Sequence, residues 1–428
     1  MLTITDHKVI MLGVPLDQAF ELAFGKLYTL PRVLIVLTGT DGTTSYTGVG
    51  EAAIDFPFVS YDMWDVYYLL RGLDLRGRKF GSTASALPPL IISHEEEEQL
   101  HCFPAALTAI TMANDDLYAR AHGWSLSSWA VRQCGQPMMS IGFGNDDDTI
   151  NQVLAVLSTG RIPKIKLGRG IEHDARLINR IVNHPVVANQ PNVLMSADFN
   201  AEYSLTETTS LLRLLNQTDL SAFTTLEQPL SATISVEEAT EFSRLIARHL
   251  GWHGRLIADE SVTTVNDAIH FVQAGWSINY KLQKIGGFRE AIRIALATNQ
   301  VPGMVGGTFP TGIGRAYDLW AVASLGCASL PSDAWQPSSD WFSDRKHLIK
   351  QAFLVNQANQ TCIFDGLGFG IDIDWPLVEP FIISHPDSEY RSIRQGLPSE
   401  MIHVDISSAR TYSDLYRELT CREPLWNL

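Results

Sequence analysis

Residues 162–168 read IPKIKLG, a short strand pattern in which two lysines, Lys164 and Lys166, alternate with apolar residues. Similar apolar runs recur along the chain, and a segment of helix length and amphipathic pattern separates most neighbours. The strand candidates are residues 137–144, 162–168, 192–198, 224–229, 255–261, 277–284 and 303–310. The helix candidates are residues 174–182, 207–215, 236–249, 265–274 and 288–297. This alternation predicts an α/β fold with a parallel sheet.

The number of repeats favours a closed barrel over an open sheet. Seven or eight strand–helix units over roughly 220 residues fit a (β/α)8 barrel. A doubly wound open sheet is the alternative, and it also binds ligands at the carboxyl ends of its strands. In either architecture the polar residues that end these strands are the candidates for a functional site.

The first quarter of the chain has a different, α+β pattern. Residues 32–37 read RVLIVL, the dipeptide Asp41-Gly42 is a turn signal, and residues 45–54 are again strand-like. This order predicts a β-hairpin. Residues 103–122 predict a helix with Pro104 in its first turn.

Composition excludes several classes of protein. The chain has 428 residues, 45% of them hydrophobic, and a net charge of −15. This acidic balance argues against nucleic acid and anionic membranes as partners, but a small anionic substrate stays possible. The five cysteines are widely spaced and form no CxxC pair, which argues against a disulfide framework and indicates a reducing compartment. With no signal-peptide pattern and no apolar run of about 18 residues, the sequence predicts a soluble cytoplasmic protein.

Charged residues end successive strand candidates at a spacing of one strand–helix repeat. In chain order they are Lys164 and Lys166, Asp198, Glu227, Asp259 and Lys281. The carboxyl ends of barrel strands meet at one mouth, where barrel active sites lie. We therefore expect these side chains to converge, although buried charges in a barrel can also form purely structural ion pairs.

The residue types indicate the chemistry of such a site. Three carboxylates are hard oxygen ligands suited to Mg²⁺ or Mn²⁺, and no His or Cys is in phase with them, which disfavours zinc. Lysines on two sides of a substrate can exchange protons with it if their pKa falls from about 10.4 towards 7–8. On an extended strand Lys284 is out of phase with Lys281, so Lys281 is predicted to face inward and Lys284 away.

The motifs at these positions resemble the enolase superfamily, and within it the mandelate racemase/muconate lactonizing enzyme group. The similarity covers roughly residues 30–380. Its motifs are KIK at 164–166, DFN at 198–200, EQP at 227–229, DES at 259–261, KLQKIGG at 281–287, GVGE at 48–51, FPAA at 103–106, TGIGRA at 311–316 and GLGFGID at 366–372. The resemblance implies a modified (β/α)8 TIM barrel with an α+β N-terminal capping domain that the C-terminal segment completes. The implied bounds are 1–134 for the cap, 135–355 for the barrel and 356–428 for the returning segment.

The resemblance also implies a set of residue roles and a homo-oligomer. Mg²⁺, with Mn²⁺ as an alternative, would be held by Asp198, Glu227 and Asp259. Lys166 and Lys281 would be the catalytic residues of a reaction that removes the proton α to a carboxylate, while the metal stabilises the enediolate. The auxiliary or substrate-binding positions would be Lys164, Asn200, Glu260 and Asp333.

Several reactions remain open at this point. The first is racemisation or epimerisation of a carboxylate such as an acyl amino acid. The second is a lyase reaction like that of o-succinylbenzoate synthase, or a cycloisomerase reaction. The third, of another class, is a non-catalytic metal-binding barrel. Residues 330–335 hold one acid, Asp333, where similar dipeptide epimerases carry an Asp-x-Asp pair, which disfavours a dipeptide with a free ammonium group.

Overall fold

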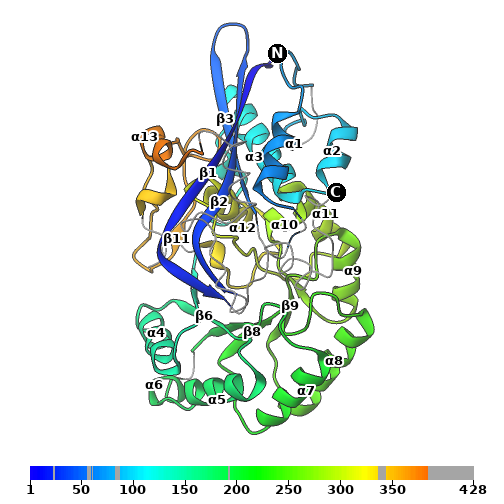
Figure 1. Cartoon of the computed structure of the whole chain (residues 1–428), viewed down its shortest axis with the longest axis vertical. Helices are drawn as coiled ribbons and strands as arrows, with labels where there is room; N and C mark the ends of the chain where they lie inside the picture. Colours follow the sequence, from blue (N-terminus) through cyan, green and yellow to red (C-terminus); the bar gives the residue numbers. More distant parts are fainter. Residues whose placement is uncertain are drawn as a thin grey trace, which may run out of the picture.

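The computed structural model describes residues 1–22, 25–54, 59, 61–81, 87–190, 193–335 and 344–383. An α+β cap lies above a larger unit of strands and helices (Figure 1). The cap sheet is antiparallel and consists of β1 (Thr3–Leu22), β2 (Gly25–Thr40) and β3 (Ser45–Ala53). Thr40 pairs with Ser45 across the turn at Asp41-Gly42, so the predicted hairpin is confirmed. The cap helices are α1 (Met63–Arg71), α2 (His94–Leu100) and α3 (Pro104–Ala121).

Two glycines of β3 explain how closely α3 packs on the cap sheet. A Cβ atom at Gly48 or Gly50 would collide with the backbone of α3, at the carbonyls of Ala113 and Ala109 respectively. Because side chains alternate along a strand, Glu51 then points away from α3. The GVGE motif thus packs its glycines on the cap helix and directs its carboxylate to the opposite side.

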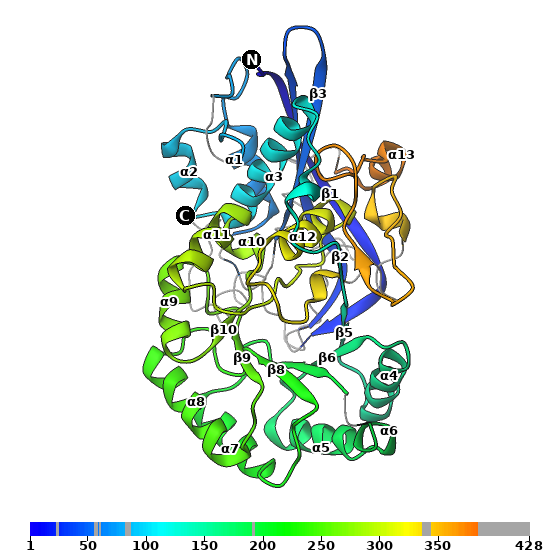
Figure 2. The ribbon, with the colours of Figure 1, turned by 180° about the vertical axis from the view of Figure 1, so that it is seen from behind.

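The larger unit is a parallel sheet surrounded by helices, as predicted (Figure 2). Its strand order is β10-β9-β8-β7-β6-β5. The strands are β5 (Met138–Ile141), β6 (Ile162–Lys166), β7 (Met195–Asp198), β8 (Phe223–Glu227), β9 (Arg255–Ala258) and β10 (Ser277–Ile278). The helices are α4 (Asp146–Ser158), α5 (Ile171–Val182), α6 (Pro185–Ala188), α7 (Leu205–Leu214), α8 (Val236–Leu250), α9 (Val265–Gln273), α10 (Leu282–Ile285), α11 (Phe288–Ala297) and α12 (Gly312–Ser324).

Two irregular segments close the ring. The predicted strand at residues 303–310 is wrong in extent, because it contains one isolated bridge, between Met304 and Asn279. Ser332 bridges to Pro137, and Met138 N–H donates to the Ser332 carbonyl. The segments around Met304 and Ser332 therefore take the seventh and eighth places between β10 and β5. The fold is a modified TIM barrel, as the resemblance implied.

The chain after the barrel returns to the cap. Its elements are 3-10 turns at Asp344–His347 and Glu379–Phe381, β11 (Thr361–Cys362) and α13 (Trp375–Val378). Ile382 bridges to Leu12 of β1, and Ile383 N–H donates to the Met11 carbonyl. The division at residues 134 and 355 stays a prediction, and residues 384–428 of the third predicted part lie outside the described residues. Among the described residues, no helix is both long and apolar enough to span a bilayer.

A disulfide joins Cys362 of β11 to Cys134 of β4 (Cys134–Gly135), a pairing that the cysteine spacing did not predict. The two cysteines are 228 positions apart in sequence, but β11 pairs antiparallel with β4 and brings them together. Cysteine spacing therefore no longer supports a reducing compartment.

Removing this disulfide should destabilise the protein. We expect the double variant Cys134→Ser/Cys362→Ser to lose about 2–4 kcal/mol of unfolding free energy, because the unfolded chain is no longer cross-linked across a long loop. Urea denaturation followed by tryptophan fluorescence measures this loss. Cys102→Ser is the control, since Cys102 is exposed and free, and its denaturation curve should match that of the parent protein. Equal curves for all three proteins would show that the disulfide does not stabilise the fold.

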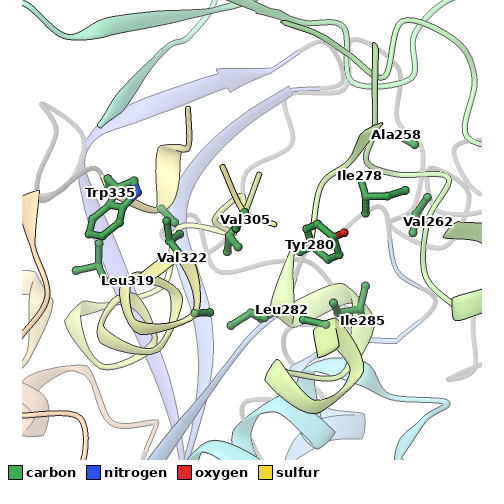
Figure 3. Packing of buried hydrophobic residues seen from close by; sticks show 14 of the residues in the cluster. Ala258, Val262, Ile278, Tyr280, Leu282, Ile285, Val305, Leu319, Val322 and Trp335 are labelled. Atoms are coloured by element: carbon green, nitrogen blue, oxygen red, sulfur yellow. The ribbon is translucent and has the colours of Figure 1, made fainter. Parts of the chain in front are cut away.

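The apolar core reaches the turn that carries Lys281. Tyr280, Leu282, Ile285 and Val305 belong to one buried cluster, which Figure 3 shows from close by. Tyr280 and Leu282 are both 0% exposed. They flank Lys281 in the chain, so packing on both sides fixes the backbone of that lysine.

Candidate active site

The predicted charged residues lie where the barrel strands end. Lys164 and Lys166 belong to β6, Asp198 ends β7, Glu227 ends β8, and Asp259 follows β9 directly. Lys281 occupies the residue position just before α10, shortly after β10. Asp198, Glu227 and Asp259 are each no more than 1% exposed. The strand ends therefore collect three buried carboxylates in one place.

The lysines pair with these carboxylates. Lys164 Nζ lies 2.6 Å from Glu227 Oε2 and 3.1 Å from Asp198 Oδ2. Lys166 Nζ lies 2.6 Å from the same Asp198 oxygen, and Lys281 Nζ lies 2.9 Å from Asp259 Oδ2. Lys166 and Lys281 thus contact different carboxylates, on strands separated by β8 in the sheet.

The predicted auxiliary residues join the same cluster. Lys166 Nζ donates to Asn200 Oδ1 at 2.9 Å, and Asn200 Nδ2 donates to Glu260 Oε1 at 3.1 Å. Asp333 Oδ2 lies 3.3 Å from Lys164 Nζ. The structure thus brings all nine predicted residues to one mouth of the barrel.

Two amide side chains that the sequence analysis did not single out hold these acidic residues, one through the backbone of Asp259 and the other through the carboxylate of Glu227. Gln228 Oε1 accepts from Asp259 N–H at 2.8 Å, and Asn279 Nδ2 donates to Glu227 Oε1 at 2.8 Å. Both amides are 0% exposed. The sequence could have pointed to both residues. Gln228 follows Glu227 directly, and Asn279 is two positions before Lys281, on the same face of an extended strand. Asn279 also accepts from Gly306 N–H and so connects the carboxylates to the loop after the seventh strand position.

The prediction that Lys284 points away from the site is wrong. Lys284 Nζ lies 2.5 Å from Asp259 Oδ1 and also donates to the Asp259 carbonyl. The prediction assumed an extended strand, but β10 ends at Ile278 and residues 282–285 form the helical turn α10. In a helix, residues three apart lie on one face, so Lys281 and Lys284 both contact Asp259.

Replacing Lys284 should therefore impair the site. We expect Lys284→Met to lower kcat/KM by about 10–100-fold, as when a residue that orients a ligand side chain is lost. Steady-state kinetics with the substrate found by the assay proposed below measure the change. Lys350→Met is the control, because Lys350 is exposed and is not one of the site residues. Unchanged kinetics for Lys284→Met would show that the contact between Lys284 and Asp259 does not contribute to catalysis.

Burial and neighbouring charges separate the pKa values of the carboxyl groups. Burial alone would raise the pKa of Asp198 and of Asp259, but adjacent lysines outweigh it and hold both pKa values well below the usual range. Burial, followed by repulsion from Asp198, raises the pKa of Glu227 to about 8. Burial and repulsion from Asp259 raise the pKa of Glu260 to about 7. The cluster therefore holds more carboxyl groups than its lysines keep fully ionised.

The donor set fits a hard divalent cation. Asp198, Glu227 and Asp259 offer only carboxylate oxygens, come from adjacent strands and open on one mouth. Oxygen donors of this kind suit Mg²⁺ or Mn²⁺, and a divalent charge would favour ionised Glu227.

Comparison with known protein families shows to which family this chain belongs. The family model described as "Enolase C-terminal domain-like" matches residues 151–377, more than half of the chain. The chain belongs to this family. The matched residues include every predicted site residue and run from the barrel into the returning segment.

Individual relatives of this enolase superfamily member are enzymes. The chain is 29% identical over 380 residues to an N-succinylamino acid racemase of Thermus thermophilus, covering 86% of this chain and 94% of that protein. It is 28% identical over 273 residues to an o-succinylbenzoate synthase of Enterococcus faecalis, covering 62% and 68%. Among solved structures, muconate lactonizing enzyme from Pseudomonas putida has a TM-score of 0.71 at 18% identity, covering 89% and 99%.

These comparisons confirm the family, its muconate lactonizing enzyme-like group and the fold. The chain is therefore an enzyme of the enolase superfamily, and the alternative of a non-catalytic barrel is set aside. A racemase, two epimerases and two o-succinylbenzoate synthases are among its relatives, so the activity class is that of an isomerase or a lyase.

Proposed function

We propose that this enzyme removes the proton α to the carboxylate of a small molecule and returns a proton to the opposite face, as a racemase or epimerase. The observation that carries the proposal is the arrangement of two lysines whose side chains are each about 10% exposed. Lys166 ends the second barrel strand and contacts Asp198, whereas Lys281 follows the sixth strand and contacts Asp259. A carbon between two such lysines can lose a proton to one and gain it from the other.

Each residue of the cluster has a role in this proposal. Asp198, Glu227 and Asp259 would hold Mg²⁺, which supplies positive charge beside the substrate carboxylate when it is bound. Lys166 and Lys281 accept and return the proton at their Nζ atoms. Asn200 orients Lys166 through its 2.9 Å hydrogen bond. Lys164, between Glu227 and Asp198, adds a fixed ammonium group close to the negative charge that develops on the substrate.

We propose an N-acylated amino acid as the substrate class. The support is the similarity to the N-succinylamino acid racemase, which extends over 94% of that protein. The single acid at Asp333, already paired with Lys164, is consistent with an amino group that is acylated rather than charged. The second candidate is the lyase reaction, favoured by the similarity to the o-succinylbenzoate synthase.

Incubation in D₂O tests this function. N-succinyl and N-acetyl amino acids of both configurations are incubated with enzyme and Mg²⁺, and the products are followed by proton NMR and chiral chromatography. A racemase replaces the α-proton by deuterium and forms the other enantiomer. Accumulation of an alkene with no other enantiomer would favour the lyase instead. Absence of exchange and of new products with every carboxylate would reject the proposed function.

Three further properties stay predictions from the resemblance and the sequence. They are the use of Mn²⁺ in place of Mg²⁺, a homo-oligomeric state and a cytoplasmic location.

A further inference from the structure

A buried ion pair of the cap reaches the barrel mouth. Arg32 of β2 and Glu51 of β3 lie 3.4 Å apart, from Nε to Oε1, and their side chains are 1% and 0% exposed. A buried ion pair is weak evidence for stability, because removing both charges from water offsets much of their attraction. Its contacts are therefore the better guide to its role.

Glu51 binds the start of a barrel helix. Its carboxylate accepts from Thr311 N–H at 2.9 Å, from the Thr311 hydroxyl at 2.6 Å and from Gly314 N–H at 2.8 Å. These groups form the N-terminus of α12, where a negative charge is favoured. A cap side chain thus completes the first turn of a helix that follows the seventh strand position.

Arg32 binds the residues just before that helix. Its Nη2 donates to the Thr308 carbonyl at 2.8 Å and to the Phe309 carbonyl at 2.6 Å. Phe309 has a φ of 53°, a left-handed conformation that is unfavourable for a non-glycine residue. The guanidinium therefore holds a strained backbone in place. We name residues 308–314 the mouth loop.

The barrel holds the residues just before the mouth loop. Gly306 N–H donates to Asn279 Oδ1 at 2.7 Å, and Gly307 N–H donates to Asp333 Oδ1 at 3.0 Å. Asn279 in turn bonds Glu227, and Asp333 pairs with Lys164. One end of this segment is thus tied to the charged cluster and the other to the cap.

The same cap strand also holds the turn that carries Lys281. Gln283 of α10 accepts from Ala53 N–H at 3.0 Å and donates to the Glu51 carbonyl at 3.1 Å. Residues 51–53 of β3 therefore contact both segments. The Glu51 side chain binds the mouth loop, and backbone groups of Glu51 and Ala53 bind the turn that carries Lys281.

We propose that Arg32 and Glu51 are positioning residues that fix the mouth loop against the charged cluster and so determine how the part of the substrate beyond its α-carbon fits. The class of that substrate rests on the proposed function. The fixing of the loop does not, because it follows from contacts within the chain.

The first test measures how fast the backbone amides of the mouth loop exchange with deuterium in the absence of substrate. We expect Glu51→Gln, which keeps the side-chain shape but loses the charge, to speed amide hydrogen–deuterium exchange of a peptide covering residues 306–316 by about tenfold. The matched control is Asp115→Asn. Asp115 is equally buried and also joins cap to barrel, through Arg289 at 2.8 Å, but it does not contact the mouth loop. Its exchange in residues 306–316 should equal that of the parent protein.

The second test measures substrate fit. With the N-succinyl amino acid that turns over, we expect Glu51→Gln to raise KM by about tenfold. Mg²⁺ affinity by calorimetry should stay within about twofold of the parent value, since the proposed ligands are intact. A purely structural defect would lower the active fraction, and hence the apparent kcat, without changing KM. Asp115→Asn should therefore keep the parent KM.

A double variant covers the case in which Glu51→Gln fails to fold. Arg32→Met/Glu51→Met replaces both charges by apolar side chains, which buried ion pairs often tolerate. It should show the same faster exchange and raised KM. Parent-like exchange in residues 306–316 for whichever variant folds would overturn the proposal. Parent-like KM with faster exchange would overturn its link to substrate fit. A parent protein without turnover would instead reject the proposed function, and the exchange test would still decide whether the pair fixes the loop.

Discussion

Replacing Lys166 by Ala should abolish α-proton exchange from one enantiomer of the substrate, and Lys281→Ala should abolish it from the other. We expect each loss to be at least about 10³-fold, the effect of removing a well-placed general base. The reason is that Lys166 ends β6 and Lys281 follows β10, with β7, β8 and β9 between these two strands in the sheet. Each lysine therefore approaches the α-carbon from a different side.

Deuterium incorporation, measured separately for the two enantiomers, gives the result directly. Lys350→Ala, an exposed lysine outside the site, is the matched control and should exchange both enantiomers at the parent rate. If one lysine variant blocks both enantiomers and the other blocks neither, a one-base lyase is the better account. If both variants retain exchange with either enantiomer, these lysines are not the bases.

Loss of a proposed metal ligand should have an effect of similar size. We expect Glu227→Gln to lower turnover by at least about 10³-fold, because the ligand loses its negative charge and one of its two oxygens is replaced by an NH₂ group. Mg²⁺ affinity measured by calorimetry should fall at least about tenfold, a readout that does not depend on turnover. Asp198→Asn and Asp259→Asn should behave alike.

The control for these variants is an equally conservative change elsewhere. Glu207→Gln alters a carboxylate in the capping box of α7, outside the site, and should keep turnover and Mg²⁺ affinity. Thermal unfolding distinguishes a lost ligand from a lost fold. A folded Glu227→Gln protein with parent-like Mg²⁺ affinity would show that the cation is not held here.

The barrel and its charged mouth could be predicted from the sequence because both depend on local patterns. Each strand–helix repeat is a short segment, and the parallel arrangement brings every strand end to one face. Lys164, Asp198 and Glu227 were therefore assigned to one site without knowledge of any long-range contact. Their closeness, for example the 2.6 Å between Lys164 Nζ and Glu227 Oε2, follows from that arrangement.

Features that depend on helical phase or on distant pairing could not be predicted in the same way. The position of Lys284 could not be predicted because residues 279–285, NYKLQKI, give no local sign that a helical turn begins at Leu282. The Cys134–Cys362 disulfide requires the pairing of β4 with β11, which no local pattern indicates. The contacts of Glu51 with Thr311 and Gly314 likewise join strands and helices that are far apart in the chain.

The most direct test of a metal-assisted removal of an α-proton is the metal dependence of deuterium incorporation. Enzyme freed of metal by EDTA is incubated in D₂O with the two enantiomers of an N-succinyl amino acid, before and after addition of Mg²⁺, and the α-proton signal is followed by NMR. We predict no measurable exchange before addition and loss of the α-proton signal from both enantiomers afterwards, with no exchange in the Lys166→Ala/Lys281→Ala double variant. Exchange that continues without Mg²⁺, or in the double variant, would contradict this account of the site.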